Sequence, residues 1–170
     1  MTDDEIIARV LRFEGGFVNN PLDRGGPTNL GITASELGRI RGLGRTATVA
    51  EMQALTREEA ASIYVQNYIK APKFNEIADG ALRLIVVDSG VLHGVTRAAK
   101  WLQQALGVSV DGVVGDQTKK ALATADAASV GRGVLKSRFK FIGAILQSNP
   151  SQVVFAAGWL NRVSDLLDVA

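Results

Sequence analysis

Three side chains suited to acid–base chemistry stand close together near the start of the chain. Glu14 is followed by Asp23 and then by Thr28, within the segment EGGFVNNPLDRGGPTNLGIT. Cleavage of a glycosidic bond needs a carboxylic acid that protonates the leaving oxygen and a second group that handles water or the developing positive charge. Glu14 suits the first role. Asp23 and Thr28 suit the second. In an inverting arrangement Asp23 is the base and the Thr28 hydroxyl orients the attacking water, whereas carboxyl groups only about 5 Å apart would indicate a retaining arrangement.

The local structure expected around Glu14 favours a protonated acid. Apolar residues between positions 6 and 11 share one face of a first helix, which we expect to end at Gly15 and Gly16. Glu14 would then lie in the last turn, where the partial negative charge of the helix end disfavours an ionised carboxyl. The next residues, 17–28, contain two Asn and two Pro and are expected to form a turn-rich loop or short irregular hairpin across that helix end.

The rest of the chain reads as helices. Thr-x-x-Glu patterns mark helix beginnings, because the hydroxyl and the carboxylate satisfy free amide groups in the first turn. We expect further helices at about 33–42, 48–54, 56–69, 75–93, 95–106 and 116–124, a long helix capped by Asp126, and a last helix from Pro150. The patterns are Thr2 with Glu5, Thr33 with Glu36, Thr48 with Glu51, and Thr56 with Glu59. The predicted fold class is mainly α, with a small irregular or β-containing lobe beside Glu14.

The composition limits the kinds of metal site, cross-link and partner that the chain can have. The 170 residues include 46% hydrophobic and 21% charged residues, no cysteine and a single histidine, His93. A disulfide framework, a thiolate metal site and a paired-histidine metal site are therefore excluded, and no metal or organic cofactor is implied. Residues 91–170 hold 9 basic against 5 acidic side chains, whereas residues 1–90 hold 10 against 12. The basic second half favours an anionic partner.

The segment from Glu14 to Thr33 resembles the signature of glycoside hydrolase family 108, the N-acetylmuramidases found among phage endolysins and secretion-associated muramidases. In that signature Glu-Gly-Gly is followed by an Asn/Asp-Pro-rich loop, Gly-Gly, Thr-Asn and Gly-Ile-Thr. The resemblance implies a lysozyme-like fold, Glu14 as catalytic acid and Asn29 as a substrate contact. It also implies peptidoglycan as the substrate, cut at the β-1,4 bond between N-acetylmuramic acid and N-acetylglucosamine.

Two later segments extend the resemblance. EEAASIYVQNYI is similar to a family helix that ends in Tyr-Trp, with Ile69 in place of the tryptophan, so Tyr64 and Tyr68 are the expected sugar contacts. AAKWLQQALGVSVDGVVGDQTKKAL resembles peptidoglycan-binding segments and implies a substrate contact at Asp111 in its turn. We therefore expect a catalytic domain at residues 1–93 and a peptidoglycan-binding-like helical segment, packed on it, at 94–170.

Several alternatives to a muramidase are open. A lytic transglycosylase would use Glu14 first as acid and then as base, and a non-catalytic protein would only bind peptidoglycan. A DNA-binding helix-turn-helix protein is disfavoured because no recognition helix with clustered Arg, Asn or Gln is evident.

The N-terminal sequence MTDDEIIARV lacks the pattern of a secretory signal. It fits an endolysin that is made in the host cytoplasm and reaches the wall through a holin, without nucleic acid as partner and without stable membrane insertion.

Other polar residues have simpler interpretations. Asp88 falls in a strongly apolar stretch, where a buried partner for an arginine or a backbone amide is expected rather than a second catalytic acid. His93 precedes Gly94 and is expected to cap a helix or to pack in the core. Basic residues recur every fourth position at Arg132, Lys136 and Lys140, as on a solvated helix face. Attraction of that face to anionic wall polymers or lipid headgroups is the functional alternative.

Overall fold

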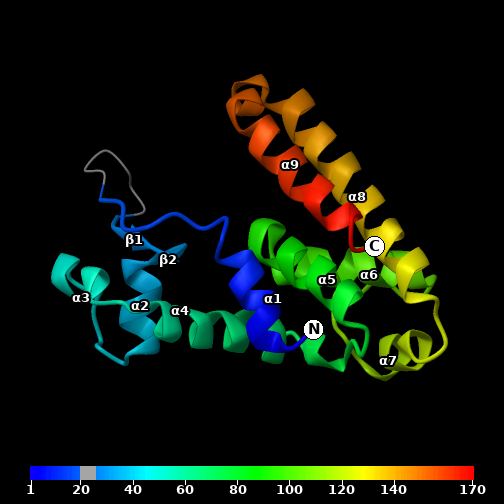
Figure 1. The fold of residues 1–170 in the computed structure, drawn as a ribbon, viewed down its shortest axis with the longest axis horizontal. Coiled ribbons are helices and arrows are strands. Elements are labelled where there is room, and N and C mark those ends of the chain that lie inside the picture. Colours follow the sequence, from blue (N-terminus) through cyan, green and yellow to red (C-terminus); the bar gives the residue numbers. More distant parts are fainter. Residues whose placement is uncertain (20–25) are drawn as a thin grey trace. The chain divides into compact units, whose positions relative to one another are not determined.

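The computed structural model describes residues 1–19 and 26–170. The chain forms two compact units, one of residues 3–66 and the other of residues 1–2 with 67–170, called here the N-terminal and C-terminal units. Both are mainly helical, and the described part of the chain contains one two-stranded sheet (Figure 1). The mainly α fold with a small β lobe predicted from the sequence is confirmed.

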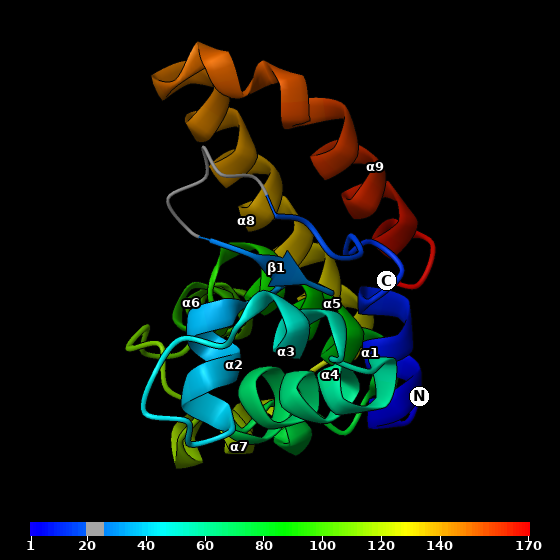
Figure 2. The same ribbon diagram turned by 90° about the vertical axis from the view of Figure 1, so that its left-hand side faces the viewer.

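The N-terminal unit surrounds this short sheet with helices. Helix α2 packs against β2, helix α3 packs against both α2 and β1, and α1 packs on α4. Figure 2 shows α2, α3 and α4 gathered near β1. The buried side chains of α1 include Ile6, Ile7 and Val10, which is the apolar face predicted from their spacing. The elements are α1 (Asp3–Val10), β1 (Thr28–Asn29), β2 (Ile32–Thr33), α2 (Ala34–Ile40), α3 (Val49–Gln53) and α4 (Arg57–Tyr64).

Threonine caps begin three of these helices. Thr48 and Glu51 form a complete capping box on α3, in which the Glu51 carboxylate accepts from the Thr48 amide at 2.7 Å. The hydroxyls of Thr33 and Thr56 accept from the backbone amides three residues later and start α2 and α4. The helix beginnings predicted at these threonines are therefore confirmed.

The first helix is shorter than predicted. It ends at Val10, and the amide of Phe13 bonds to the Val10 carbonyl in a tighter turn instead of continuing the α-helix. A further turn would gain no apolar burial, because Phe13 is 47% exposed and the next position on the apolar face is Glu14 itself. The prediction that places Glu14 in the last turn of a helix is therefore wrong.

The C-terminal unit is built on three mutually packed helices, α5 (Gly80–His93), α6 (Val95–Leu106) and α8 (Ala127–Ser148). Helix α9 (Ala156–Leu167) returns along α8 as a hairpin (Figure 1). Asp126 caps α8 by accepting from the amide of Ser129, as predicted. The remaining elements are the π-helix η1 (Val65–Lys70), the 3-10 helices η2 (Phe74–Glu76) and η3 (Pro150–Phe155), and α7 (Asp116–Leu122).

Three predicted helices differ in detail. The helix expected at 56–69 changes from α to π geometry at Val65. The helix expected at 75–93 is divided, because Asp79 caps a new start by accepting from the Leu82 amide at 2.7 Å. The last helix begins with the 3-10 turns of η3 after Pro150 and becomes α-helical only at Ala156. Within the described ranges, no helix combines the length and the apolar character needed to span a bilayer.

Candidate active site

A tight hairpin in the N-terminal unit forms the first part of the site. Strands β1 and β2 are antiparallel, and Asn29 pairs with Ile32 across a two-residue turn of Leu30 and Gly31. Both turn residues have positive φ, 51° and 75°, as in the turns that suit the twist of a hairpin. Glycine adopts this conformation without strain, whereas Leu30 does not. The neighbouring structure must therefore hold the turn in place.

Gly31 brings Glu14 and Tyr64 together. A Cβ atom built on Gly31 would lie 2.6 Å from Oε2 of Glu14 and would also collide with the hydroxyl of Tyr64. The Tyr64 hydroxyl donates to the carbonyl oxygen of Leu30 at 3.1 Å. The segment after α1, the hairpin turn and the last residue of α4 therefore meet around one carboxyl group.

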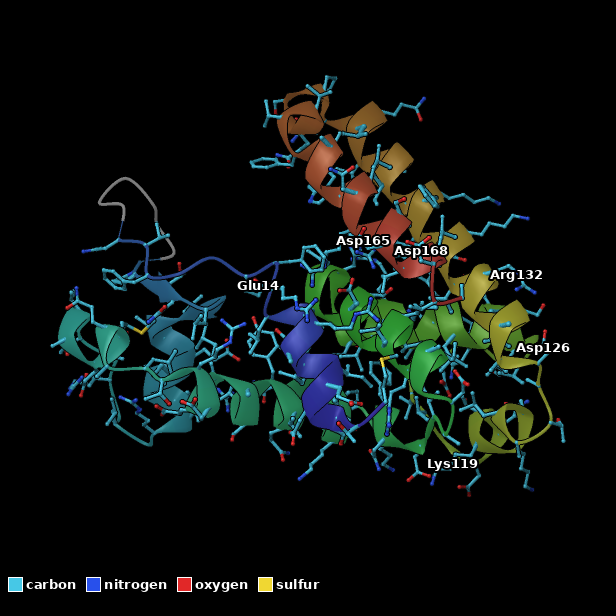
Figure 3. All side chains as sticks on the ribbon, viewed as in Figure 1. Glu14, Lys119, Asp126, Arg132, Asp165 and Asp168 are labelled. Atoms are coloured by element: carbon cyan, nitrogen blue, oxygen red, sulfur yellow. The ribbon has the colours of Figure 1, made fainter. Side chains whose placement is uncertain are left out.

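Glu14 is partly shielded from water by the structure around it. Glu14 is half-buried and lies on the irregular segment that follows α1, where Figure 3 labels it. Tyr64 is 2% exposed, and its hydroxyl lies close to the same Cβ position of Gly31 as the Glu14 carboxyl. A carboxyl that is partly shielded from water but reachable from outside can contact a bound substrate.

The hairpin also contains two other predicted site residues. The backbone of Thr28 is bonded to Val18 in both directions, at 2.8 and 2.9 Å, so that Thr28 lies in the middle of the lobe, and its side chain is half-buried. Asn29 is 8% exposed, and its amide donates to the Met52 carbonyl at 2.8 Å, which ties α3 to the hairpin. Asp23, the predicted base, lies outside the described residues.

Two further predicted contacts belong to the C-terminal unit. Tyr68 is half-buried in η1, beside the fully buried Ile69. The Asp111 carboxylate accepts from the side-chain amide of Gln103 at 2.7 Å and from the backbone amide of Val113 at 2.8 Å. These bonds lower the pKa of Asp111 and hold the Asp-Gly turn against α6. The roles of Tyr68 and Asp111 in substrate binding stay predictions.

Sequence reasoning missed the positions of Leu30 and Gly31 next to Glu14. A signal was available, because the glycine stands between Thr28-Asn29 and the pair Ile32-Thr33, as expected for a two-residue hairpin turn. That signal predicts the turn, but not the carboxyl that lies against it.

Comparisons with known proteins show the family and the fold of the chain. The family model described as Glycosyl hydrolase 108 matches residues 7–94, and the model described as Predicted Peptidoglycan domain matches residues 97–164. A solved structure titled "Structure of Brucella abortus SagA" is similar at 31% sequence identity and a TM-score of 0.78. The alignment covers 98% of this chain and 91% of that chain. No curated protein matches the chain in sequence.

The mainly helical fold with its short hairpin and the comparisons define the class of lysozyme-like glycoside hydrolases. Within that class the chain belongs to the glycosyl hydrolase 108 family and carries a peptidoglycan-binding domain after the hydrolase domain. The resemblance found in the sequence is confirmed. The chain is a glycosidase that degrades peptidoglycan, and peptidoglycan is its partner.

Proposed function

We propose that this glycosidase is an endolysin-type muramidase, which hydrolyses the β-1,4 bond between N-acetylmuramic acid and N-acetylglucosamine with Glu14 as general acid. One observation carries the proposal: the Glu14 carboxyl is half-buried against Gly31. A side chain larger than that of glycine at position 31 would collide with this carboxyl. Residues 1–93 would form the catalytic domain and residues 94–170 the peptidoglycan-binding segment. The compact units divide earlier, between residues 66 and 67, so the catalytic sequence would extend into the C-terminal unit.

In the proposed reaction Glu14 gives its proton to the oxygen of the leaving sugar. The bond between this oxygen and the anomeric carbon breaks, and positive charge develops on the ring that keeps that carbon. Asp23 removes a proton from a water molecule held by the Thr28 hydroxyl, and the oxygen of that water bonds to the anomeric carbon. Tyr64 is a positioning residue, because its bond to Leu30 keeps the turn against Glu14.

The test is the digestion of purified sacculi by the whole chain and by the variant Glu14→Gln. Glu58→Gln is the matched control, since Glu58 is an exposed glutamate of the same unit. We expect Glu14→Gln to lower the rate of fragment release by a factor of roughly 10² to 10⁴, as for loss of a general acid, and Glu58→Gln to leave it unchanged. Full activity of Glu14→Gln would exclude Glu14 as the acid.

Mass spectrometry of the released fragments tests the reaction type. Hydrolysis adds water and leaves reducing N-acetylmuramic acid ends. In a lytic transglycosylase the 6-hydroxyl of the muramyl sugar attacks instead of water and gives anhydro ends. Anhydro products in place of reducing ends would replace the proposed hydrolysis by transglycosylation, while Glu14 would keep its role as acid.

The proposed biological setting is release from a host cell. By resemblance to phage endolysins, the chain would be made in the host cytoplasm and would reach the peptidoglycan after a holin opens the inner membrane. Expression in the cytoplasm of a bacterium, with and without a co-expressed holin, tests this route. Lysis only with the holin is expected, and lysis at the same rate without it would contradict the dependence.

A further inference from the structure

A surface hollow of about 300 Å³ lies within the C-terminal unit, where the end of α5 and the start of α6 meet α8, η3 and α9. Besides two aliphatic side chains, it is lined by His93, Arg97, Phe141, Gln152 and Trp159, a set called here the aromatic hollow. Ligand pockets usually measure roughly 300 to 1,000 Å³. The size therefore suits one sugar with its substituent or a short peptide end rather than a long glycan strand.

The cation of the aromatic hollow is held in position before any ligand arrives. The Arg97 guanidinium donates to the His93 carbonyl at 2.7 Å, and its Cζ lies 4.2 Å from the centre of the Phe141 ring. Phe141 in turn packs edge-on against His93, with ring centres 5.3 Å apart. An arginine fixed in this way binds a carboxylate with little loss of side-chain entropy.

A buried nitrogen in the same wall lacks a bond. Nε2 of His93 is buried and has no hydrogen-bond partner among the described residues. Burial and the nearby arginines lower the pKa of His93 to about 4, so the ring is neutral near pH 7. An unsatisfied buried polar atom is unfavourable, and a ligand or water that bonds to it removes that penalty.

The charges below the hollow favour an anion. Arg138 and Arg162 both bind the buried Asp88 carboxylate, at 2.7 and 2.8 Å. Arg138, Arg97 and Arg162 lie close enough to His93 to lower its pKa, while Asp88 raises it. Arg97, which lines the hollow itself, and the arginines behind His93 favour a negatively charged group there.

We propose that the aromatic hollow binds a carboxylate-bearing muropeptide, with a peptide carboxylate on Arg97 and the apolar face of the sugar on Trp159. Gln152 can bond to an amide of the same ligand. The inference rests on the proposed function, because it assumes peptidoglycan as the substrate, and it assigns the binding site of the second domain. The site would hold the enzyme on the wall after each cleavage.

The test measures binding of a purified disaccharide-tripeptide by titration calorimetry, with the whole chain carrying Glu14→Gln to prevent turnover. Arg97→Gln is compared with Lys100→Gln, which removes the same charge from an exposed position of the same helix, outside the hollow. We expect Arg97→Gln to weaken binding at least about tenfold, as for a lost charge-assisted bond, and Lys100→Gln to change it less than about twofold. Uncharged chitobiose should bind more weakly than the muropeptide.

A second variant addresses the aromatic surface. Trp159→Ala should also weaken binding about tenfold or more, since sugar faces pack on aromatic rings. Circular dichroism during heating shows whether this variant stays folded. If Trp159→Ala does not stay folded, Trp159→Phe is measured in its place. Because this variant keeps an aromatic face, it should bind the muropeptide more tightly than Arg97→Gln does. Binding equal to that of the parent in both Arg97→Gln and Trp159→Ala would overturn the assignment, and so would chitobiose binding as tight as that of the muropeptide.

The outcome is distinguishable from failure of the proposed function. If the chain with Glu14 intact digests sacculi but muropeptide binding does not depend on Arg97, only the assignment of the hollow fails. If the chain releases no fragments while Arg97→Gln still weakens binding, the muramidase proposal fails and the hollow stands. The assignment of the aromatic hollow also fails if the chain digests sacculi but does not bind the muropeptide.

Discussion

Arg138 donates a hydrogen bond of 2.7 Å to the carboxylate of Asp88, and both side chains are almost fully buried. The pair joins α8 to α5. Arg162 of α9 binds the second carboxylate oxygen of Asp88 at 2.8 Å, which joins α9 to the same cluster. Burial lowers the pKa of Arg138 more than Asp88 raises it, so the contact with Asp88 offsets only part of the desolvation cost. The C-terminal unit therefore depends on each member of this cluster.

Asp88→Asn should destabilise the C-terminal unit strongly. The substitution removes the charge that both buried guanidinium groups bind, and loss of one member of a buried ion pair costs about 3 to 5 kcal/mol. Urea unfolding followed by circular dichroism measures this change. Asp165→Asn, at an exposed position of α9 labelled in Figure 3, is the control and should change the free energy of unfolding by less than about 0.5 kcal/mol. Equal stability of the two variants would contradict the role of the cluster.

Gly31→Ala should impair both folding and wall digestion. Its Cβ would overlap the Glu14 carboxyl and the Tyr64 hydroxyl, and the residue has a φ of 75°. Gly42→Ala is a close control, because Gly42 has a φ of 64° but open space around its Cβ position. Both variants should lose about 1 kcal/mol from backbone strain, but only Gly31→Ala should lower the rate of fragment release, by about tenfold or more. Equal rates of fragment release by the two variants would show that the turn at Gly31 does not affect the activity that depends on Glu14.

Acid should weaken the C-terminal unit through His93. The pKa of His93 is lowered to about 4 in the folded protein, chiefly by burial, from an ordinary value of 6.5. Between these values the unfolded chain binds a proton that the folded chain does not, so stability falls as the pH falls from 6.5 to about 4. The full shift corresponds to about 3 kcal/mol, which partial exposure of the ring reduces to roughly 1 to 2 kcal/mol.

Comparison with His93→Gln isolates this effect from the carboxylates that titrate in the same range. Urea unfolding of both proteins at pH 7 and pH 4.5 should give a smaller loss of stability on acidification for His93→Gln. Parallel pH profiles of the two proteins would show that His93 does not contribute.

Thr48→Ala should destabilise the N-terminal unit by about 1 kcal/mol, because it removes the hydroxyl that accepts from the Glu51 amide at the start of α3. Thr46→Ala, at a nearby exposed threonine outside the cap, is the control. Thermal unfolding of the two variants measures the difference. A melting temperature of Thr48→Ala no lower than that of Thr46→Ala would mean that the capping box contributes no stability.

Helix beginnings were predictable because their causes are local. The caps at Thr33, Thr48, Thr56 and Asp126 each bond to an amide three residues away, so the relevant partners can be read from the sequence. The end of α1 was not predictable in the same way. Whether the helix continues past Val10 depends on what its apolar face can bury, and Phe13 finds no cover.

The buried charged residues were also predictable only in part. The position of Asp88 in an apolar stretch indicated a buried arginine partner, and this interpretation is confirmed. The identity of the partners was not predictable, because Arg138 lies 50 residues away in the sequence and Arg162 lies 74 away. Arg138 belongs to a helix whose other basic residues, Arg132, Lys136 and Lys140, are exposed. Figure 3 shows the labelled Arg132 near the start of that helix.

By itself, the sequence determined the family and the helix starts at Thr33, Thr48, Thr56 and Asp126, and it predicted Glu14 as the acid, since these depend on residue types at short spacings. Only the tertiary structure decided that Gly31 and the Tyr64 hydroxyl adjoin that carboxyl, and that His93, Arg97 and Trp159 line one hollow. The physical reason is that these residues come from different elements. Their proximity results from packing of apolar faces over long sequence separations, which no local pattern encodes.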